Sequence, residues 1–289
     1  MSGRSGTNMK DEPKWEDPRS VLRRHGMIPR RSFSQNFLVS RVAADEMASA
    51  AVSREGTLVV ELGAGVGTLT AALVRAGARV VAVERDRRMV GILQTEFAPQ
   101  SAVRVVAADA ARIDIGSLIP DGIGSICVAG NLPYAITGAI IRHLVGSSRY
   151  LARAVLTVQR EVGERLRAEP GTAAYGALTV FTSAVFSVSA VFTLSASCFY
   201  PRPRVDSVVV RLDPLVSPRA RETEAFRHLV KSAFQNRRKT LRNALLQSES
   251  ADAECIDAAL RRTDIDGRRR GETLSVEEFA RLADSWKPA

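Results

Sequence analysis

The chain has 289 residues, 45% of them hydrophobic, which is enough for one sizeable core and a smaller second domain. Lys and Arg number 41 against 31 for Asp and Glu, so the formal net charge is +10. This surplus favours a polyanionic partner, most often a nucleic acid, over a basic protein that is merely soluble. The three cysteines lie far apart without a CxxC pair, which argues against disulfides and a zinc site and favours a reducing compartment.

The N-terminal residues show no targeting signal. They lack the apolar stretch of a signal peptide, and Asp11, Glu12, Glu16 and Asp17 are atypical of an acid-poor transit peptide. We therefore expect residues 1–18 to form a disordered polar tail and the protein to be cytoplasmic.

Short apolar runs follow one another along the chain, each typical of a buried strand: TLVVELGAG (57–65), ARVVAVERD (78–86), VRVVAADA (103–110), SICVAGNLPY (125–134), ARAVLTVQ (152–159) and SVSAVFTL (187–194). Helical patterns separate most of them, for example at 68–75 and 88–97. This alternation predicts an α/β fold with a mostly parallel sheet and helices on both faces. In such folds ligands bind at the carboxyl ends of the strands.

Residues 170–201 carry no charge, which raises the question of a membrane span. Ser and Thr recur throughout the segment, Gly176 interrupts it, and its second half partly alternates in polarity as a strand does. A membrane-spanning helix is more uniformly apolar. We therefore expect a buried helix followed by a buried strand, and no membrane partner.

The composition changes at RLDPLVSPRARETE, residues 211–224, where two prolines and mixed charges indicate a linker. Helical patterns follow at 223–247, 251–262 and 275–286. We expect a catalytic domain at 19–213 and a small helical domain at 214–289.

The first predicted strand runs into a glycine loop, ELGAGVGTLT. Gly63, Gly65 and Gly67 allow a tight turn and a close approach to a ligand, and the helix that follows presents free N–H groups. Nicotinamide-dependent dehydrogenases have a similar loop. However, the GxGxG spacing and Glu61, two residues ahead of the first glycine, favour a ligand with a cationic amino group.

Acidic residues also stand at the next two strand ends. Glu84, about 20 residues beyond the glycine loop, has the position that commonly binds ribose hydroxyls. Asp109, at the third strand end, is placed to accept from an adenine amino group. Each acid alone has a second interpretation as a solvated loop residue, but amino acid, ribose and adenine in this order describe S-adenosylmethionine.

The fourth strand ends in Asn-Leu-Pro-Tyr, residues 131–134. An aromatic amino group is a poor nucleophile because its lone pair is delocalised, and two acceptors aimed at its N–H groups favour a pyramidal nitrogen. We expect the Asn131 side-chain oxygen to be one acceptor and the Pro133 carbonyl to be the other. Tyr134 is expected to stack on the base.

A base gripped in this way must first leave its stack. A second aromatic side chain would then hold its other face. Phe199, in FYPRPRVDS, is the first candidate and Tyr200 the next, while packing in the core is the alternative for Phe199.

With these motifs the chain resembles the ribosomal RNA adenine N6-dimethyltransferases over about residues 21–282. The matching motifs are SQNFL, ELGAGVGTLT, Glu84, the DA at Asp109, NLPY, QREVGERL, YGALTV, FYPRPRVDSVVVRL and AFQNRRKTLRNAL. This family includes a KsgA type, which acts on small-subunit rRNA, and an Erm type, which acts on large-subunit rRNA and confers macrolide resistance. RRKTLRNAL, YGALTV and Leu132 resemble the KsgA type.

The resemblance implies a methyltransferase-type Rossmann fold with a small C-terminal helical domain, S-adenosyl-L-methionine as cofactor, and no metal. It implies dimethylation of two adjacent adenosines in a hairpin loop near the 3′ end of 16S rRNA, in an immature ribosomal subunit. Separately, we expect the protein to be a monomer. The catalytic residues are then expected at Asn131, Leu132, Pro133, Tyr134 and Phe199. The cofactor-binding residues are expected at Gln35, Asn36, Phe37, Glu61, Gly63, Gly65, Gly67, Glu84, Arg85, Asp109, Ala110 and Asn131.

A cluster of cations, Arg237, Arg238, Lys239 and Arg242, falls on one predicted helix. We expect these side chains to contact RNA phosphates, with help from RRHGMIPRRSF at 23–33. Three alternatives stay open: an Erm-type 23S rRNA enzyme, a non-catalytic rRNA-binding assembly factor, and a DNA adenine methyltransferase, which shares the Asn-x-Pro-Tyr motif.

Overall fold

The computed structural model describes residues 13–30, 35–248 and 252–286. Residues 1–12 of the expected tail lie outside these ranges, as do residues 31–33 of the basic N-terminal stretch. Trp15 packs against the hydrophobic core, and helix α1 (Pro18–Arg24) begins at Pro18 with Asp17 as its N-cap. The last part of the expected tail is therefore an ordered part of the described structure.

The chain divides into two compact units. Unit 1 contains Met1–Ile140, Arg149–Arg160 and Ala190–Arg211, and unit 2 contains Ile141–Ser148, Glu161–Ser189 and Leu212–Ala289. The last segment of unit 2 starts close to the expected boundary at 213, but two segments from the middle of the chain also belong to this unit. Pattern reasoning missed this because the association depends on contacts such as the packing of α7 (Ala177–Ser183) on α8 (Glu224–Gln235).

A seven-stranded sheet has the strand order β4-β3-β2-β5-β6-β9-β7. The first five strands of this order pair in parallel: β4 (Val103–Ala107), β3 (Arg79–Glu84), β2 (Leu58–Leu62), β5 (Ile126–Asn131) and β6 (Leu151–Gln159). The predicted strands are all present. The strand order reverses between β2 and β5, where Glu61 pairs with Ala129, and such a switch point opens a ligand crevice at the carboxyl ends.

The sheet contains one strand that the pattern analysis did not assign, β9 (Ser207–Pro214). Its three consecutive valines, Val208, Val209 and Val210, are at most 2% exposed. This apolar run is typical of a buried strand. It was not assigned as one because it lies close to the prolines of the predicted linker.

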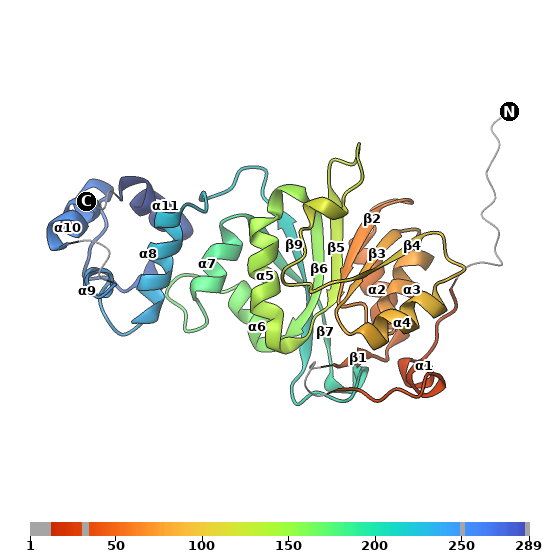
Figure 1. Cartoon of the computed structure of the whole chain (residues 1–289). Helices are drawn as coiled ribbons and strands as arrows, with labels where there is room; N and C mark the ends of the chain where they lie inside the picture. Colours follow the sequence, from red (N-terminus) through yellow and green to blue (C-terminus); the bar gives the residue numbers. More distant parts are fainter. Residues whose placement is uncertain (1–12, 31–34, 249–251, 287–289) are drawn as a thin grey trace. The chain divides into compact units, whose positions relative to one another are not determined.

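Several helices of unit 1 are drawn beside strands β2, β3 and β4 (Figure 1). Helices α2 (Arg41–Ala51) and α3 (Thr68–Arg75) pack on each other, and α4 (Arg87–Glu96) packs on β3 and β4. Two-residue strands β1 (Phe37–Leu38) and β8 (Phe199–Tyr200) pair with each other. The remaining short elements are η2 (Gly116–Leu118), η3 (Tyr134–Ile136), η4 (Ser148–Tyr150) and η5 (Ala196–Cys198), and α5 (Thr137–Gly146) follows η3.

The uncharged segment at 170–201 forms a helix and a strand, as expected. Helix α7 buries Thr179, Val180, Phe181 and Thr182. The expectation of a buried strand is wrong for β7 (Phe186–Leu194): only its two ends are buried, because it is the last strand of the sheet. Across the described ranges, no helix is both long enough and apolar enough to cross a membrane.

Unit 2 is mainly helical, with α6 (Arg160–Leu166), α7, α8, α9 (Leu241–Leu246), α10 (Ala253–Thr263), η6 (Gly271–Thr273) and α11 (Val276–Ser285). The single helix predicted at 223–247 is wrong. Helix α8 ends at Gln235, and α9 begins only at Leu241 with Thr240 as its N-cap. The Thr240 hydroxyl accepts a hydrogen bond from the Asn243 N–H, so the side chain satisfies a free donor of a new helix start.

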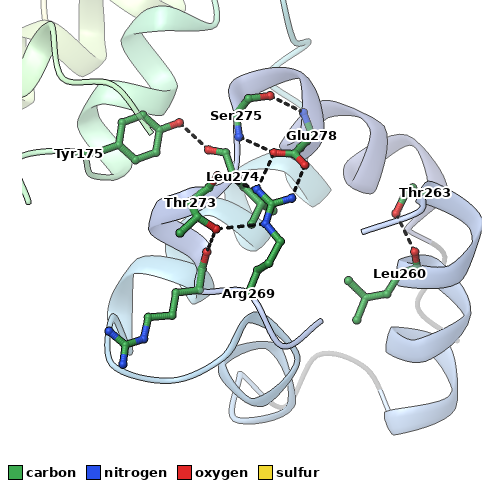
Figure 2. Close-up of polar contacts among 9 residues, drawn as sticks. Tyr175, Leu260, Thr263, Arg269, Thr273, Leu274, Ser275 and Glu278 are labelled. Atoms are coloured by element: carbon green, nitrogen blue, oxygen red, sulfur yellow. Dashed lines mark hydrogen bonds and ion pairs between the residues drawn. The ribbon is translucent and has the colours of Figure 1, made fainter. Parts of the chain in front are cut away.

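Polar contacts connect the loops of unit 2, as Figure 2 shows. The Tyr175 hydroxyl donates to the Leu274 carbonyl at 2.9 Å, which ties the YGALTV motif to the segment before α11. Ser275 and Glu278 form a capping box at the start of α11, and the Glu278 carboxylate also binds the Arg269 guanidinium.

Candidate active site

A cavity of about 380 Å³ opens at the carboxyl ends of the parallel strands of unit 1. This lies within the range of roughly 300–1,000 Å³ that is typical of small-molecule sites. The expected residues that line it are Gln35, Asn36, Phe37, Glu61, Gly63, Gly65, Glu84, Arg85, Asp109, Ala110, Asn131, Leu132 and Pro133. The structure therefore brings together residues that are up to about a hundred positions apart in the chain.

The glycine loop follows β2, and Gly63, Gly65 and Gly67 all have positive φ, at 76°, 59° and 89°. A Cβ atom on Gly67 would lie 2.2 Å from the Phe97 ring, so no larger residue fits there. Gly67 is the N-cap of α3 and does not line the cavity. Its role here is to pack the loop closely, whereas Gly63 and Gly65 form part of the cavity wall.

Glu61 lines the cavity and is only 1% exposed. The Thr70 hydroxyl, from α3, donates a hydrogen bond to it at 2.5 Å. Burial raises the pKa of Glu61 to about 8. A cationic group entering the cavity would favour the ionised carboxylate, as expected for a contact to the amino group of an amino acid.

Glu84, at the end of β3, connects several parts of the site. One carboxylate oxygen accepts from the Gly65 N–H at 2.9 Å, and the other accepts from the N–H groups of Arg85 and Asp86 at 2.7 and 2.8 Å. Burial raises the pKa of Glu84. The carboxylate thus orients the glycine loop and retains lone pairs for ligand hydroxyls.

Asp86 is a residue that the sequence reasoning missed. It is 4% exposed, and its carboxylate accepts from the Gln35 side chain at 3.1 Å and from the Arg88 guanidinium at 2.6 Å. Burial alone would raise the pKa of Asp86, but the hydrogen bonds from Arg88 hold it below its usual value. The available signal was its position as the N-cap of α4, directly after the β3 carboxyl end.

Asp109 lies at the third strand end, as expected. Its carboxylate accepts from the Ala111 N–H at 3.0 Å and forms an ion pair with Arg85 at 3.3 Å. Arg85 therefore lies between the second and third strand ends, where its guanidinium orients the Asp109 carboxylate.

The Asn131 side chain is held in one orientation by Asn36, the residue directly before β1. Its side-chain N–H donates to the Asn36 carbonyl at 2.7 Å, which leaves the side-chain oxygen as an available acceptor. The Pro133 carbonyl, expected as the second acceptor, already accepts from the Ile136 N–H at 3.1 Å and the Thr137 hydroxyl at 3.2 Å. Within the described ranges nothing donates to the Leu132 carbonyl, which makes Leu132 the better second acceptor.

The two expected stacking aromatics do not line the cavity. The Tyr134 hydroxyl is hydrogen-bonded to the Ser207 hydroxyl at 2.6 Å, and burial raises the pKa of Tyr134. Phe199 is 3% exposed and belongs to the hydrophobic core, as in the alternative interpretation. Tyr200 beside it is 40% exposed. Stacking by Tyr134 and Phe199 stays a prediction.

The cation cluster of unit 2 does not lie on one helix, because Arg237, Arg238 and Lys239 fall between α8 and α9. Arg237 binds Glu272 and the carbonyls of Ala173 and Tyr175, each at 3.0 Å. The Arg242 guanidinium, on α9, donates two hydrogen bonds to the Asp257 carboxylate, at 2.6 and 2.8 Å. Arg238 and Lys239 are exposed and form no ion pair with any described residue.

The sheet with its switch point, the glycine loop and the three acids define an S-adenosylmethionine-dependent methyltransferase of the Rossmann type. The chain belongs to the ribosomal RNA adenine dimethylase family, whose model matches residues 28–287. This membership confirms the predicted family, fold class and cofactor. The cavity fits the cofactor, since it offers a carboxylate for each of its amino, ribose and adenine groups.

Named relatives and solved structures agree with this assignment. The chain is 43% identical to "Ribosomal RNA small subunit methyltransferase A" of Myxococcus xanthus over 276 residues, which is 94% of this chain and 96% of the relative. It is 40% identical over 257 residues to the protein of the same name from Clostridium botulinum, covering 88% of this chain and 92% of the relative.

Among solved structures, a dimethyladenosine transferase from Plasmodium falciparum matches with a TM-score of 0.72 at 26% identity, covering 85% of this chain and 95% of the other. The 23S rRNA methyltransferase ErmE matches with a TM-score of 0.62 at 26% identity, covering 87% of this chain and 99% of the other. In the part of the chain that the structure describes, no group of three or more His, Cys, Asp or Glu side chains is arranged to hold a metal ion.

Proposed function

We propose that this protein dimethylates the N6 atoms of two adjacent adenosines in a hairpin loop near the 3′ end of 16S rRNA. The observation that carries the chemistry is the fixed orientation of Asn131, whose side-chain oxygen is free to accept from an adenine amino group. The names of the relatives from Myxococcus xanthus and Clostridium botulinum support the small-subunit target.

In this mechanism the residues act on the attacking nitrogen. S-adenosylmethionine supplies a methyl group bound to a sulfonium, and the N6 lone pair forms the new bond as the S–C bond breaks and sulfur keeps its electron pair. The Asn131 side-chain oxygen and the Leu132 carbonyl would accept the two N6–H groups and favour the pyramidal nitrogen. The methylated nitrogen then loses a proton to solvent, and positioning for in-line attack contributes much of the rate.

We propose the cofactor contacts as follows. Glu61 binds the α-ammonium, Glu84 the ribose hydroxyls, and Asp109 the adenine amino group. Gln35 and Asn36 close the cavity from the β1 side, next to Phe37. Arg85 and Ala110 shape the adenine end, and Gly63 and Gly65 allow the backbone to approach the ligand.

We propose that residues 214–289 help to dock the RNA and that the enzyme acts as a monomer in the cytoplasm on an immature small subunit. Arg238 and Lys239 are the cations of the expected cluster that support this role, because neither forms an ion pair with a described residue. Arg237 and Arg242 would contribute by holding their loops in place.

A second candidate, methylation of 23S rRNA, has the structural similarity to ErmE in its favour. The test is to offer the purified enzyme, with radiolabelled cofactor, undermethylated small subunits and naked 23S rRNA in parallel. Dimethylation of two adjacent small-subunit adenosines supports the proposal. Methylation of 23S rRNA alone would establish the second candidate, and binding without methyl transfer would indicate a non-catalytic assembly factor.

A further inference from the structure

The segment from Phe199 to Ser207 is attached to the candidate active site at both ends. At its start, β8 pairs with β1: Tyr200 lies opposite Phe37, and Phe199 opposite Leu38. Phe37 and Leu38 line the cavity. At its end, the buried Ser207 hydroxyl is bonded to the Tyr134 hydroxyl of the NLPY motif at 2.6 Å.

The interior of the segment is also constrained. One Asp206 carboxylate oxygen accepts from the Ala196 N–H at 3.0 Å, and the Asp206 carbonyl accepts from the Arg160 N–H at 3.1 Å. Pro201 and Pro203 restrict the backbone between them. A loop held in this way loses little conformational entropy when a ligand binds.

The outer surface of this segment carries groups that the proposed mechanism does not use. Tyr200 is 40% exposed and Val205 is 45% exposed. Arg202 and Arg204 are exposed, and neither is paired with an acid among the described residues. An exposed ring beside two free guanidinium groups suits unpaired RNA, because bases stack on aromatic rings and arginine binds phosphates.

We propose that Tyr200, Arg202 and Arg204 bind the unpaired nucleotides that flank the target adenosine. The two arginines take phosphates, and the Tyr200 ring takes a neighbouring base. The contact between Ser207 and Tyr134 connects this segment to the NLPY motif, in which Asn131 and Leu132 are the proposed acceptors for the target base. This inference rests on the proposed function and adds the part of the RNA that this loop recognises.

The test compares Arg202→Ala/Arg204→Ala with the matched double variant Arg54→Ala/Arg79→Ala. Arg54 and Arg79 are also exposed and without an acidic partner among the described residues, but they precede β2 and begin β3, at the opposite ends of those strands. Both variants therefore lose the same charge from unit 1. The measurements are the Kd for a hairpin-loop RNA by direct binding, its salt dependence, and the Kd for S-adenosylmethionine.

We expect the loop variant to bind RNA about tenfold or more weakly, since each lost contact is a charged hydrogen bond. The slope of log K against log salt should flatten by roughly 0.7 per lost phosphate contact, while cofactor affinity stays unchanged. Tyr200→Ala should weaken RNA binding, and Tyr200→Phe should preserve it, because stacking needs the ring and not the hydroxyl.

Equal RNA affinity and equal salt slopes in the loop and control variants would overturn the inference. Unchanged cofactor affinity in the loop variant shows that the fold is intact. A wild-type enzyme that transfers no methyl group to RNA would contradict the proposed function instead, and the binding measurements would still decide the role of the loop.

Discussion

The side-chain N–H of Asn131 and the backbone carbonyl of Asn36 are joined by a hydrogen bond of 2.7 Å across 95 positions of sequence. This contact assigns the amide orientation, so the Asn131 oxygen remains as an available acceptor, which is the atom that we propose binds the substrate. It also connects the end of β5 to the chain segment that closes the cofactor cavity.

Replacing Asn131 with Ala should remove nearly all methyl transfer and leave cofactor affinity close to that of the wild type. The oxygen matters most as the amino nitrogen becomes pyramidal, so its loss acts on the transition state. Single-turnover rates and cofactor calorimetry check this. A rate within about threefold of the wild type would contradict the role given to Asn131, because it corresponds to a rise in the activation free energy of less than roughly 1 kcal/mol.

The Glu84→Ala variant should bind S-adenosylmethionine more weakly by about 1–3 kcal/mol, the usual loss for a charged hydrogen-bond partner. It should also unfold at a lower temperature, because Glu84 accepts from three backbone N–H groups around the glycine loop. Calorimetry and thermal unfolding measure the two effects. Glu84→Gln, which retains an acceptor oxygen, is the matched control and should show smaller losses, and unchanged affinity in Glu84→Ala would contradict the ribose contact.

The raised pKa of Glu61 predicts that the stability of the cofactor-free protein depends on pH. Burial raises its pKa from 4.5 to about 8, so between these values the folded state binds more protons than the unfolded state. The free energy of unfolding should therefore fall as the pH rises from about 4.5 to about 8, and level off above that. Denaturant titrations at several pH values check this, with Glu61→Gln expected to lose the trend.

Cofactor binding should release protons near pH 7, because the α-ammonium favours the ionised form of Glu61. Calorimetry in buffers of different ionisation enthalpy measures the number released. The Glu61→Gln variant should release fewer protons than the wild type. Equal proton release in the two proteins would show that Glu61 does not face the ammonium group.

The cations between α8 and α9 should differ in their effects: we expect Arg238 and Lys239 to act on RNA binding and Arg237 to act on thermal stability. Arg238→Ala/Lys239→Ala should weaken RNA binding and flatten its salt dependence by roughly 0.7–0.9 per lost phosphate contact, with no change in thermal stability. Arg237→Ala should instead lower the Tm by about 2–4 °C, because its contacts to Glu272 and two carbonyls disappear. An unchanged Tm in Arg237→Ala would argue against the structural role of this side chain.

The Tyr134–Ser207 contact should show energetic coupling in a double-mutant cycle. Tyr134→Phe and Ser207→Ala each remove the same hydrogen bond, so the double variant should be little worse than either single variant. The expected effect of each is a higher KM for RNA with cofactor affinity unchanged. Strictly additive losses would show that the two hydroxyls act independently. Ser207→Thr retains the hydroxyl and should recover part of the loss.

The sequence by itself determined the strands of the parallel sheet, the glycine loop and the order of the acids at the strand ends. Helix α3 was predicted to the residue, at Thr68–Arg75. These features depend on local patterns, since a buried strand needs an apolar run and a tight turn needs glycine. For the same reason, local pattern indicated the cavity residues Glu61, Gly63, Gly65, Glu84, Asp109 and Asn131, whereas Gln35, Asn36 and Phe37 followed only from the family resemblance.

Tertiary structure alone decided which groups are free to act. The Pro133 carbonyl already accepts from Ile136 and Thr137, which is why we propose the Leu132 carbonyl as the second acceptor instead. Arg237 is held by Glu272, and Phe199 lies in the core instead of in the cavity. Hydrogen-bond partners and burial arise from residues distant in the chain, and residue type and spacing do not encode them directly.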